Sequence, residues 1–133
     1  MENKEAIKII ETLHKEVESF GIKIKKDLII EELKKVREIA LKEEAPRMVK
    51  AARLIFEHIE AYNAFNIAML SDEPIEGFDD SNLGTESDIE ENEEAQKESL
   101  LYLLSIMKDP SNRMNASDLK EYNILLKSYA ELH

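Results

Sequence analysis

The chain of 133 residues contains no cysteine, and it has only three glycines and three prolines. Without cysteine, neither a disulfide framework nor a thiolate zinc site can form. So few glycines and prolines do not suit a sheet protein built on tight turns. Apolar residues make up 43% of the chain and charged residues 35%, a balance that favours long helices with solvated outer faces around one core. We therefore predict an all-α, single-domain, antiparallel helical bundle over residues 1–133.

Long hydrophobic runs are also missing. The longest stretch without a charged residue is 61–71, which is far shorter than the roughly 20 residues that a membrane-spanning helix needs. The first residues, MENKEAIK, carry charges where a secretory signal would have its apolar region. We expect a cytoplasmic protein without a membrane partner.

Five segments show the apolar spacing of amphipathic helices. Gly21 supplies a left-handed stop, Asp27 is a candidate N-cap, and Pro46 suits the first turn of a helix. Asn115 and Asp118 resemble a capping pair before the last helix. The predicted helices span about 3–20, 27–44, 46–70, 91–108 and 116–132, with an acidic loop over 71–90.

The predicted helix 46–70 has the widest apolar face and is our candidate for the central helix. Near its end, two asparagines interrupt the run AYNAFNIAML. Asn66 falls on the inward seam, where an amide needs a partner, so we predict a hydrogen bond to a nearby carbonyl, to Tyr122 or to Tyr129. Asn63 falls about 60° to one side of that seam, and the sequence leaves its role open.

The negative charge is confined to one region. Residues 71–98 hold twelve acids and one base, which accounts for the whole net charge of -11, because the flanking regions carry equal numbers of acids and bases. The chain is therefore a neutral scaffold with an acidic insert. Such an insert repels a phosphate backbone, and no uniformly basic domain compensates, so we expect no nucleic-acid partner.

A calcium-loop interpretation of the insert fails on register. Starting at Asp79 places Gly84 and Glu90 at the sixth and twelfth loop positions, as an EF-hand requires, but Leu83 then stands at a ligand position without a side-chain oxygen. Starting at Asp80 places Thr85 at the glycine position. We favour a solvated or partner-binding segment.

Other candidate chemistry is sparse. Glu11 and His14 have the Glu-x-x-His spacing of di-iron bundles, but the motif occurs once, whereas those bundles need it twice. His58 lies in an apolar stripe without a neighbouring nucleophile, which favours a structural histidine. Arg47, Lys50 and Arg53 could receive an anion at the start of a helix, or could be where the acidic insert docks. We predict no catalytic residue, no metal ligand and no cofactor.

We therefore predict a non-enzymatic bundle, an inhibitor, immunity-type factor or adaptor, which presents its acidic segment to a partner protein with a basic surface. One alternative is a metal- or anion-binding bundle that uses Glu11, His14 or His58. A second alternative is a structural homodimer through Phe65, Ile67, Met69 and Leu70. The predicted partner-binding residues are Asp72, Glu73, Glu76, Phe78, Asp79, Asp80, Glu86, Asp88, Phe65 and Leu70.

Overall fold

The structure is a computed structural model that describes residues 4–67 and 92–132. These residues form five helices: α1 (Lys4–Phe20), α2 (Lys26–Lys42), α3 (Pro46–Tyr62), α5 (Glu93–Met107) and α6 (Arg113–Leu132). No strand occurs among them. The predicted all-α bundle is confirmed. No helix of the described part of the chain is long and apolar enough to cross a membrane.

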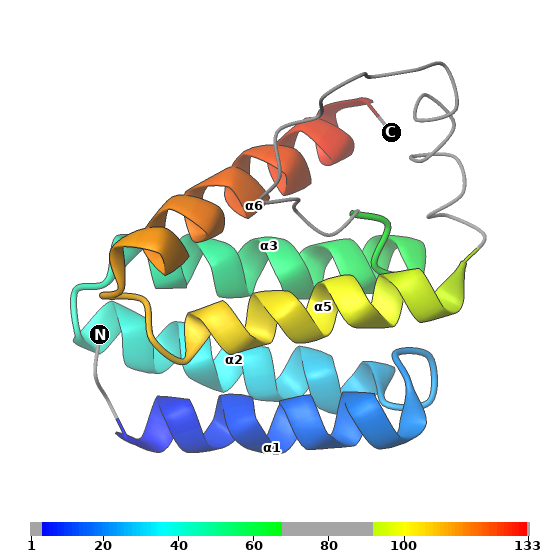
Figure 1. Cartoon of the computed structure of the whole chain (residues 1–133), viewed down its shortest axis with the longest axis horizontal. Coiled ribbons are helices and arrows are strands. Elements are labelled where there is room, and N and C mark those ends of the chain that lie inside the picture. Colours follow the sequence, from blue (N-terminus) through cyan, green and yellow to red (C-terminus); the bar gives the residue numbers. More distant parts are fainter. Residues whose placement is uncertain (1–3, 68–91, 133) are drawn as a thin grey trace.

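The helices form a ring in which each helix has two principal neighbours, in the order α1, α2, α3, α6, α5 and back to α1. Successive helices run in opposite directions along the bundle (Figure 1). Because a ring of five cannot alternate all the way round, one neighbouring pair must be parallel, and that pair is α3 and α6. The expectation that helix 46–70 is central is therefore wrong, because α3 is one side of the ring.

The core is one continuous cluster to which all five helices contribute. In α1 the buried residues are Ala6, Ile10, Leu13 and Val17, which follow the predicted seam. In α2 they are Ile29, Ile30, Leu33, Val36 and Ala40. Burying each large aliphatic side chain contributes about 1.5–3 kcal/mol, so these seams supply the main drive for the helices to associate.

Two of the predicted helix boundaries are confirmed, and the structure shows the expected backbone conformation at each. Gly21 has φ 85°, a left-handed conformation, and its N–H donates to the Val17 carbonyl at 2.8 Å, which closes the end of α1. Pro46 stands in the first turn of α3, where no N–H is needed.

Two predicted caps are wrong. Lys25 precedes α2 without a side-chain cap, and Asp27 lies inside the first turn, where its charge complements the helix dipole. The last helix begins at Arg113 because the Asn112 side-chain oxygen accepts the N–H groups of Met114 and Asn115, at 2.9 and 3.2 Å. The Asn115 amide instead donates to the Asp109 carbonyl at 3.0 Å.

The largest difference lies at the end of α3, which stops at Tyr62 and does not continue to residue 70. Asn63 adopts a left-handed conformation with φ 55°, and its N–H donates to the Ile59 carbonyl at 2.8 Å. Asparagine tolerates this conformation better than most residues, so it can end a helix as glycine does. The chain then turns, and residues 63–67 lie against α5 and α6 at one end of the ring (Figure 1).

Candidate functional site

Most of the predicted partner-binding residues lie outside the described residues, in the range 68–91. These are Leu70, Asp72, Glu73, Glu76, Phe78, Asp79, Asp80, Glu86 and Asp88. Their role stays a prediction. Met69, which we assigned to the alternative homodimer interface, falls in the same range.

Phe65 is the one predicted partner-binding residue that the structure describes, and it is fully buried. Its ring packs against His58 and Tyr122, with centroid separations of 5.7 and 6.5 Å, and its N–H donates to the Gln96 side-chain oxygen at 3.3 Å. Ile67 is also buried, at 5% exposure. The two residues therefore belong to the core, and not to the partner-binding or homodimer surface that we predicted for them. The reason is the turn at Asn63, which directs them inward.

A set of polar contacts holds that turn in place. His58 is 4% exposed, and its Nε2 accepts the N–H of Asn66 at 3.0 Å. The Asn66 amide nitrogen in turn donates to the Tyr129 hydroxyl at 3.0 Å, which confirms one of the partners predicted for Asn66. Because Nε2 is the acceptor, the neutral imidazole carries its proton on Nδ1. These contacts support a structural role for His58, which holds the backbone that follows α3 in place.

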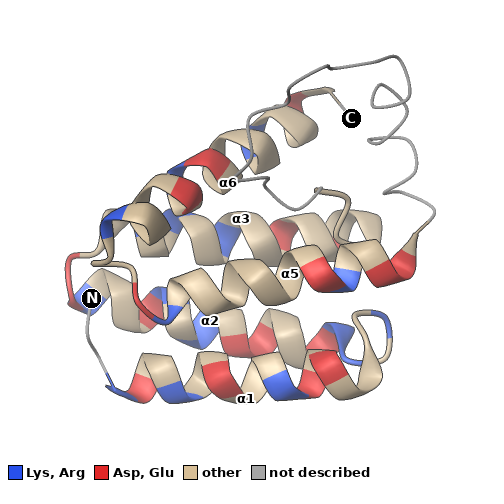
Figure 2. Ribbon diagram, in the orientation of Figure 1, with Lys and Arg blue, Asp and Glu red and all other residues tan. Residues whose placement is uncertain are grey.

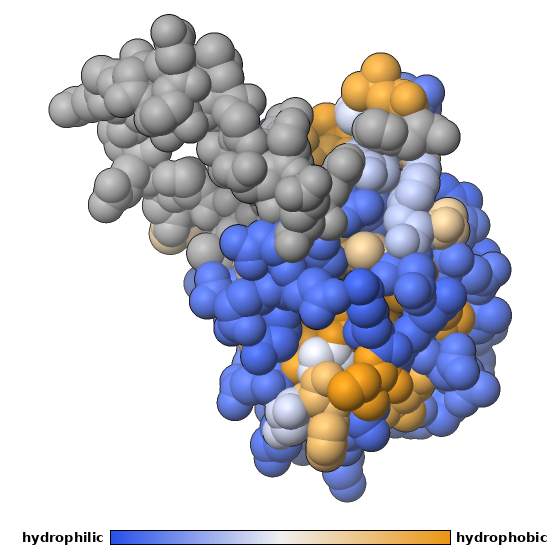
Figure 3. All heavy atoms as spheres, turned by 90° about the vertical axis from the view of Figure 1, so that its right-hand side faces the viewer, coloured by the Kyte–Doolittle hydropathy of each residue, from blue (hydrophilic) through white to orange (hydrophobic). Residues whose placement is uncertain are grey.

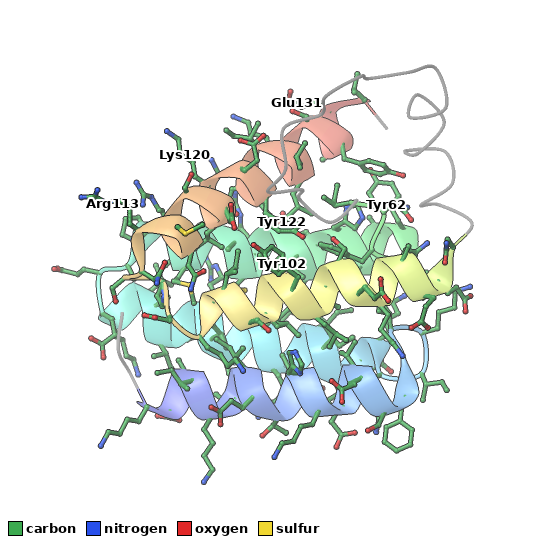
Figure 4. All side chains as sticks on the ribbon, in the orientation of Figure 1. Tyr62, Tyr102, Arg113, Lys120, Tyr122 and Glu131 are labelled. Carbon is green, nitrogen blue, oxygen red and sulfur yellow. The ribbon has the colours of Figure 1, made fainter. Side chains whose placement is uncertain are left out.

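Aromatic rings surround this histidine. The rings of Tyr62 and Tyr129 stand edge-to-face with centroids 5.0 Å apart, and each lies within 5.0 Å of the His58 ring. Edge-to-face pairs at such separations are favourable beyond the area they bury. Figure 4 shows Tyr62 at the end of α3 that faces the C-terminal half of α6. The stack ties α3 to α6, the parallel pair of the ring.

The other two tyrosines connect α5 to α6 (Figure 4). Tyr122 is fully buried, and its hydroxyl shares a hydrogen bond with the Ser99 hydroxyl at 3.1 Å. The Tyr102 hydroxyl donates to Asp118 at 2.5 Å. All four tyrosines of the chain thus lie where α3, α5 and α6 meet. The apolar spacing of the sequence puts Tyr62, Tyr122 and Tyr129 on the inward faces of their helices, but it does not show that they lie close together.

The possible metal ligands do not converge. Glu11 is exposed, and the His14 Nδ1 lies 3.8 Å from a carboxylate oxygen of Glu18, a neighbour one turn along the same helix. Within residues 4–67 and 92–132, no group of three or more His, Cys, Asp or Glu side chains is placed to hold a metal ion. The geometry gives no support to a metal site at these residues.

Surface ion pairs tie the connections between helices. Lys25 contacts Glu16 at 3.1 Å, and Lys23 contacts Glu93 at 2.6 Å, so the turn between α1 and α2 is linked to the start of α5. On α2, a hydrogen bond from Lys35 to Glu32, together with their Coulomb attraction, raises the pKa of Lys35. These pairs lie at the surface of the bundle, and we assign them no functional role.

The turn between α1 and α2 carries exposed apolar side chains. The apolar spacing of the helix predicted over 3–20 includes Phe20 and predicts that this residue is buried. In the structure Phe20 is 52% exposed, and Ile24 is 75% exposed. The prediction for Phe20 is wrong because α1 ends there, and no helix covers its last turn. A hollow of about 290 Å³ separates residues 19–24 from the first turn of α5. Figure 3 views this end of the bundle and shows apolar surface among hydrophilic residues.

The cations predicted to receive an anion are divided between two hollows at the opposite end of the bundle. Lys50 and Arg53 line a groove of about 600 Å³ between α2 and α3, together with Arg37. Arg47 instead lines a separate hollow of about 370 Å³ that reaches Pro110 and Leu119. The three cations predicted from the sequence therefore do not form one site, and Arg37 is a groove residue that the spacing within one helix could not indicate.

Comparison of the chain with protein-family models, with curated proteins and with solved structures gave no match. A functional assignment therefore depends on the chemistry of the chain itself.

Proposed function

We propose that this chain is a non-enzymatic helical bundle that binds another protein, as an inhibitor, immunity-type factor or adaptor. The contact residues are those of its acidic segment, 71–90, and the partner presents a basic surface. The observation that carries the proposal is the separation of charge. Residues 68–91 hold nine acids and no base, whereas residues 4–67 and 92–132 hold 19 acids and 18 bases.

The described bundle is electrically mixed. Figure 2 shows acidic and basic residues interspersed along the helices, so the bundle offers no large field of either sign. Nine carboxylates in one segment, in contrast, create a local field that steers a basic partner and raises the rate of association. Their mutual repulsion disfavours packing of the segment into a neutral core, so a structural role does not explain their number.

Both attachment points of the segment lie at the same end of the bundle. α3 ends and α5 begins there (Figure 1). The exposed Phe20 and Ile24 line the hollow beside the start of α5. Charged contacts contribute specificity and association rate, while apolar contacts at the centre of an interface contribute most of the affinity. We therefore include Phe20 and Ile24 in the proposed surface in place of Phe65.

The test is capture of partners from a native lysate of the source organism, with a matched pair of variants. The first variant neutralises five acids of the segment: Asp72, Glu73, Glu76, Asp79 and Asp80, changed to Asn or Gln. The control neutralises five exposed helical acids: Glu11, Glu31, Glu60, Glu121 and Glu131, changed to Gln. Both variants carry the same net charge, so only the position of the lost charges differs.

We expect both variants to keep the helical circular dichroism of the wild type, because none of the changed residues is buried in the described core. The segment variant should lose the captured partner, and the control should retain it. If the segment variant still captures the same partner at wild-type yield, the proposed acidic contact surface is wrong. Equal loss in both variants would show a net-charge effect and would also contradict the proposal.

The homodimer alternative loses support from the burial of Phe65 and Ile67, because side chains inside the core of one chain cannot form its interface. The metal alternative rests on Glu11, His14 and His58, which belong to two different helices and do not converge.

A further inference from the structure

The groove between α2 and α3 combines an apolar floor with a basic rim. Ala40, Leu41, Ala45, Pro46 and Val49 make the floor. Ala40 and Ala45 have short side chains, which leaves the hollow, and Leu41 is 46% exposed beside it. A volume of about 600 Å³ falls in the range of small-ligand pockets, roughly 300–1,000 Å³, and gives room for bulky side chains of a bound peptide.

The rim has a charge surplus. Arg37, Lys50 and Arg53 line the groove against a single acid, Glu44. A guanidinium nitrogen of Arg37 lies 3.6 Å from a carboxylate oxygen of Glu38, and the Arg53 Nε lies 4.0 Å from a carboxylate oxygen of Glu57. Both distances are too long for a good hydrogen bond. Lys50 forms no ion pair with any residue in the described part of the chain.

One rim atom is buried without an acceptor. The Arg37 Nε is shielded from solvent, and no described residue accepts its hydrogen bond. A buried donor without a partner is unfavourable, so the described bundle leaves part of the hydrogen-bonding capacity of this guanidinium unused. The side chain is 34% exposed, and its accessible part can donate charge-assisted hydrogen bonds to a carboxylate. Together with the other rim charges, Arg37 therefore favours an anionic ligand.

We propose that the α2–α3 groove binds an acidic peptide segment of a partner protein, in which carboxylates flank a bulky apolar side chain. The apolar side chain lies on Leu41, Ala45 and Val49, and the carboxylates contact Arg37, Lys50 and Arg53. An acyl chain fits less well, because the groove is open on its outer side and would leave most of a long chain in water.

The groove is a second binding surface, distinct from the one in the proposed function. It lies at the α2–α3 turn, whereas the acidic segment is attached at the opposite end of α3 (Figure 1). α3 has 17 residues, so the two ends are roughly 25 Å apart. The charges are also opposite, since one surface attracts a basic partner and the other an acidic one. The chain could therefore bridge two proteins.

The test uses fluorescence anisotropy at physiological salt with a labelled synthetic peptide of pattern Gly-Asp-Glu-Leu-Phe-Asp-Glu-Gly. We expect saturable binding by the full chain. Changing both Lys50 and Arg53 to Gln should weaken it at least about tenfold, and Leu41→Ser at least about threefold. A matched control changes Lys8 and Lys15, two exposed lysines of α1, to Gln, and should stay within about twofold of wild type.

Four results would overturn the assignment. The first is that the peptide shows no saturable binding. The second is that a peptide with Ser in place of Leu and Phe binds equally well, which would reveal a merely ionic surface. The third is that laurate displaces the peptide at a lower concentration than the unlabelled peptide does, which would indicate an anionic lipid. The fourth is that binding becomes tighter after neutralisation of the five segment acids but not of the five helical acids, which would indicate that the chain's own segment occupies the groove in place of a partner.

Each variant is checked by circular dichroism, so that a loss of binding is separated from a loss of fold. The groove variants leave the acidic segment intact, so they should still capture a basic partner. Failure of the groove assignment is therefore distinguishable from failure of the proposed function.

Discussion

The burial of two phenylalanines is the reverse of what the sequence suggested, since Phe65 is buried and Phe20 is exposed. Alanine substitutions test this directly. Phe65 is fully buried between His58 and Tyr122, while Phe20 is 52% exposed at the end of α1. Replacing a buried phenylalanine by alanine typically costs about 3–5 kcal/mol, because apolar contact is lost and a cavity remains. For a domain whose total stability is about 5–15 kcal/mol, Phe65→Ala should remove a large share of it.

Phe20→Ala is the matched control with the same chemical change. About half of the Phe20 side chain is already in water, so less transfer free energy is lost. Lys25 Nζ lies 4.5 Å from the ring centroid, and an exposed cation–π contact contributes about 0.5–1 kcal/mol. We expect Phe20→Ala to cost no more than about 1.5 kcal/mol, with most of the loss from partial burial and this contact.

The measurement is equilibrium urea unfolding followed by circular dichroism at the helix band, with the free energy of unfolding in water from linear extrapolation. The m-value should stay constant if the folded state keeps its compactness. Phe65→Ala should lower the midpoint well below that of Phe20→Ala. Equal costs, or the reverse order, would refute the inward turn after Asn63 and restore the continuous helix that the apolar spacing suggested.

Two further predictions concern the ends and contacts of α3, α5 and α6. In thermal unfolding, Asn63→Gly should leave the stability unchanged or raise it slightly, because glycine adopts a positive φ without strain. Asn63→Ala should lower the stability by about 1 kcal/mol, because φ 55° is costly for alanine. An Ala variant as stable as the wild type would contradict this helix end. Tyr102→Phe should cost about 1.5–3 kcal/mol, because its hydroxyl donates to the carboxylate of Asp118. In a double-mutant cycle, the variant with both Tyr102→Phe and Asp118→Asn should cost less than the sum of the two single variants, and additive costs would show that the contact is not formed.

Much of the fold was predictable from local pattern. Apart from Phe20 at the end of α1, the buried residues of α1 and α2 follow the apolar spacing, because one continuous stripe is the face that a helix must bury. Gly21 and Pro46 ended or began helices as expected, because each acts through its own backbone and needs no distant partner. The candidate surfaces were less predictable. The acids could be counted, but Arg37 joins Lys50 and Arg53 in the groove only because α2 and α3 are adjacent in space.

By itself, the sequence determined the helical class, the buried faces, two helix boundaries and the confinement of the net charge to one segment. These properties depend on neighbours along the chain and on composition. Only the tertiary structure decided where α3 ends and which phenylalanine is covered. Residues 62–69 keep a helical apolar spacing, yet the helix ends because Asn63 adopts a left-handed conformation. After this turn, the Phe65 N–H donates to Gln96, the Asn66 N–H donates to His58, and the Asn66 side-chain amide donates to Tyr129. Gln96 and Tyr129 lie on α5 and α6, far from Asn63 along the chain. The spacing of apolar residues predicts which face of a helix is apolar, but it does not show which distant residues pack against that face.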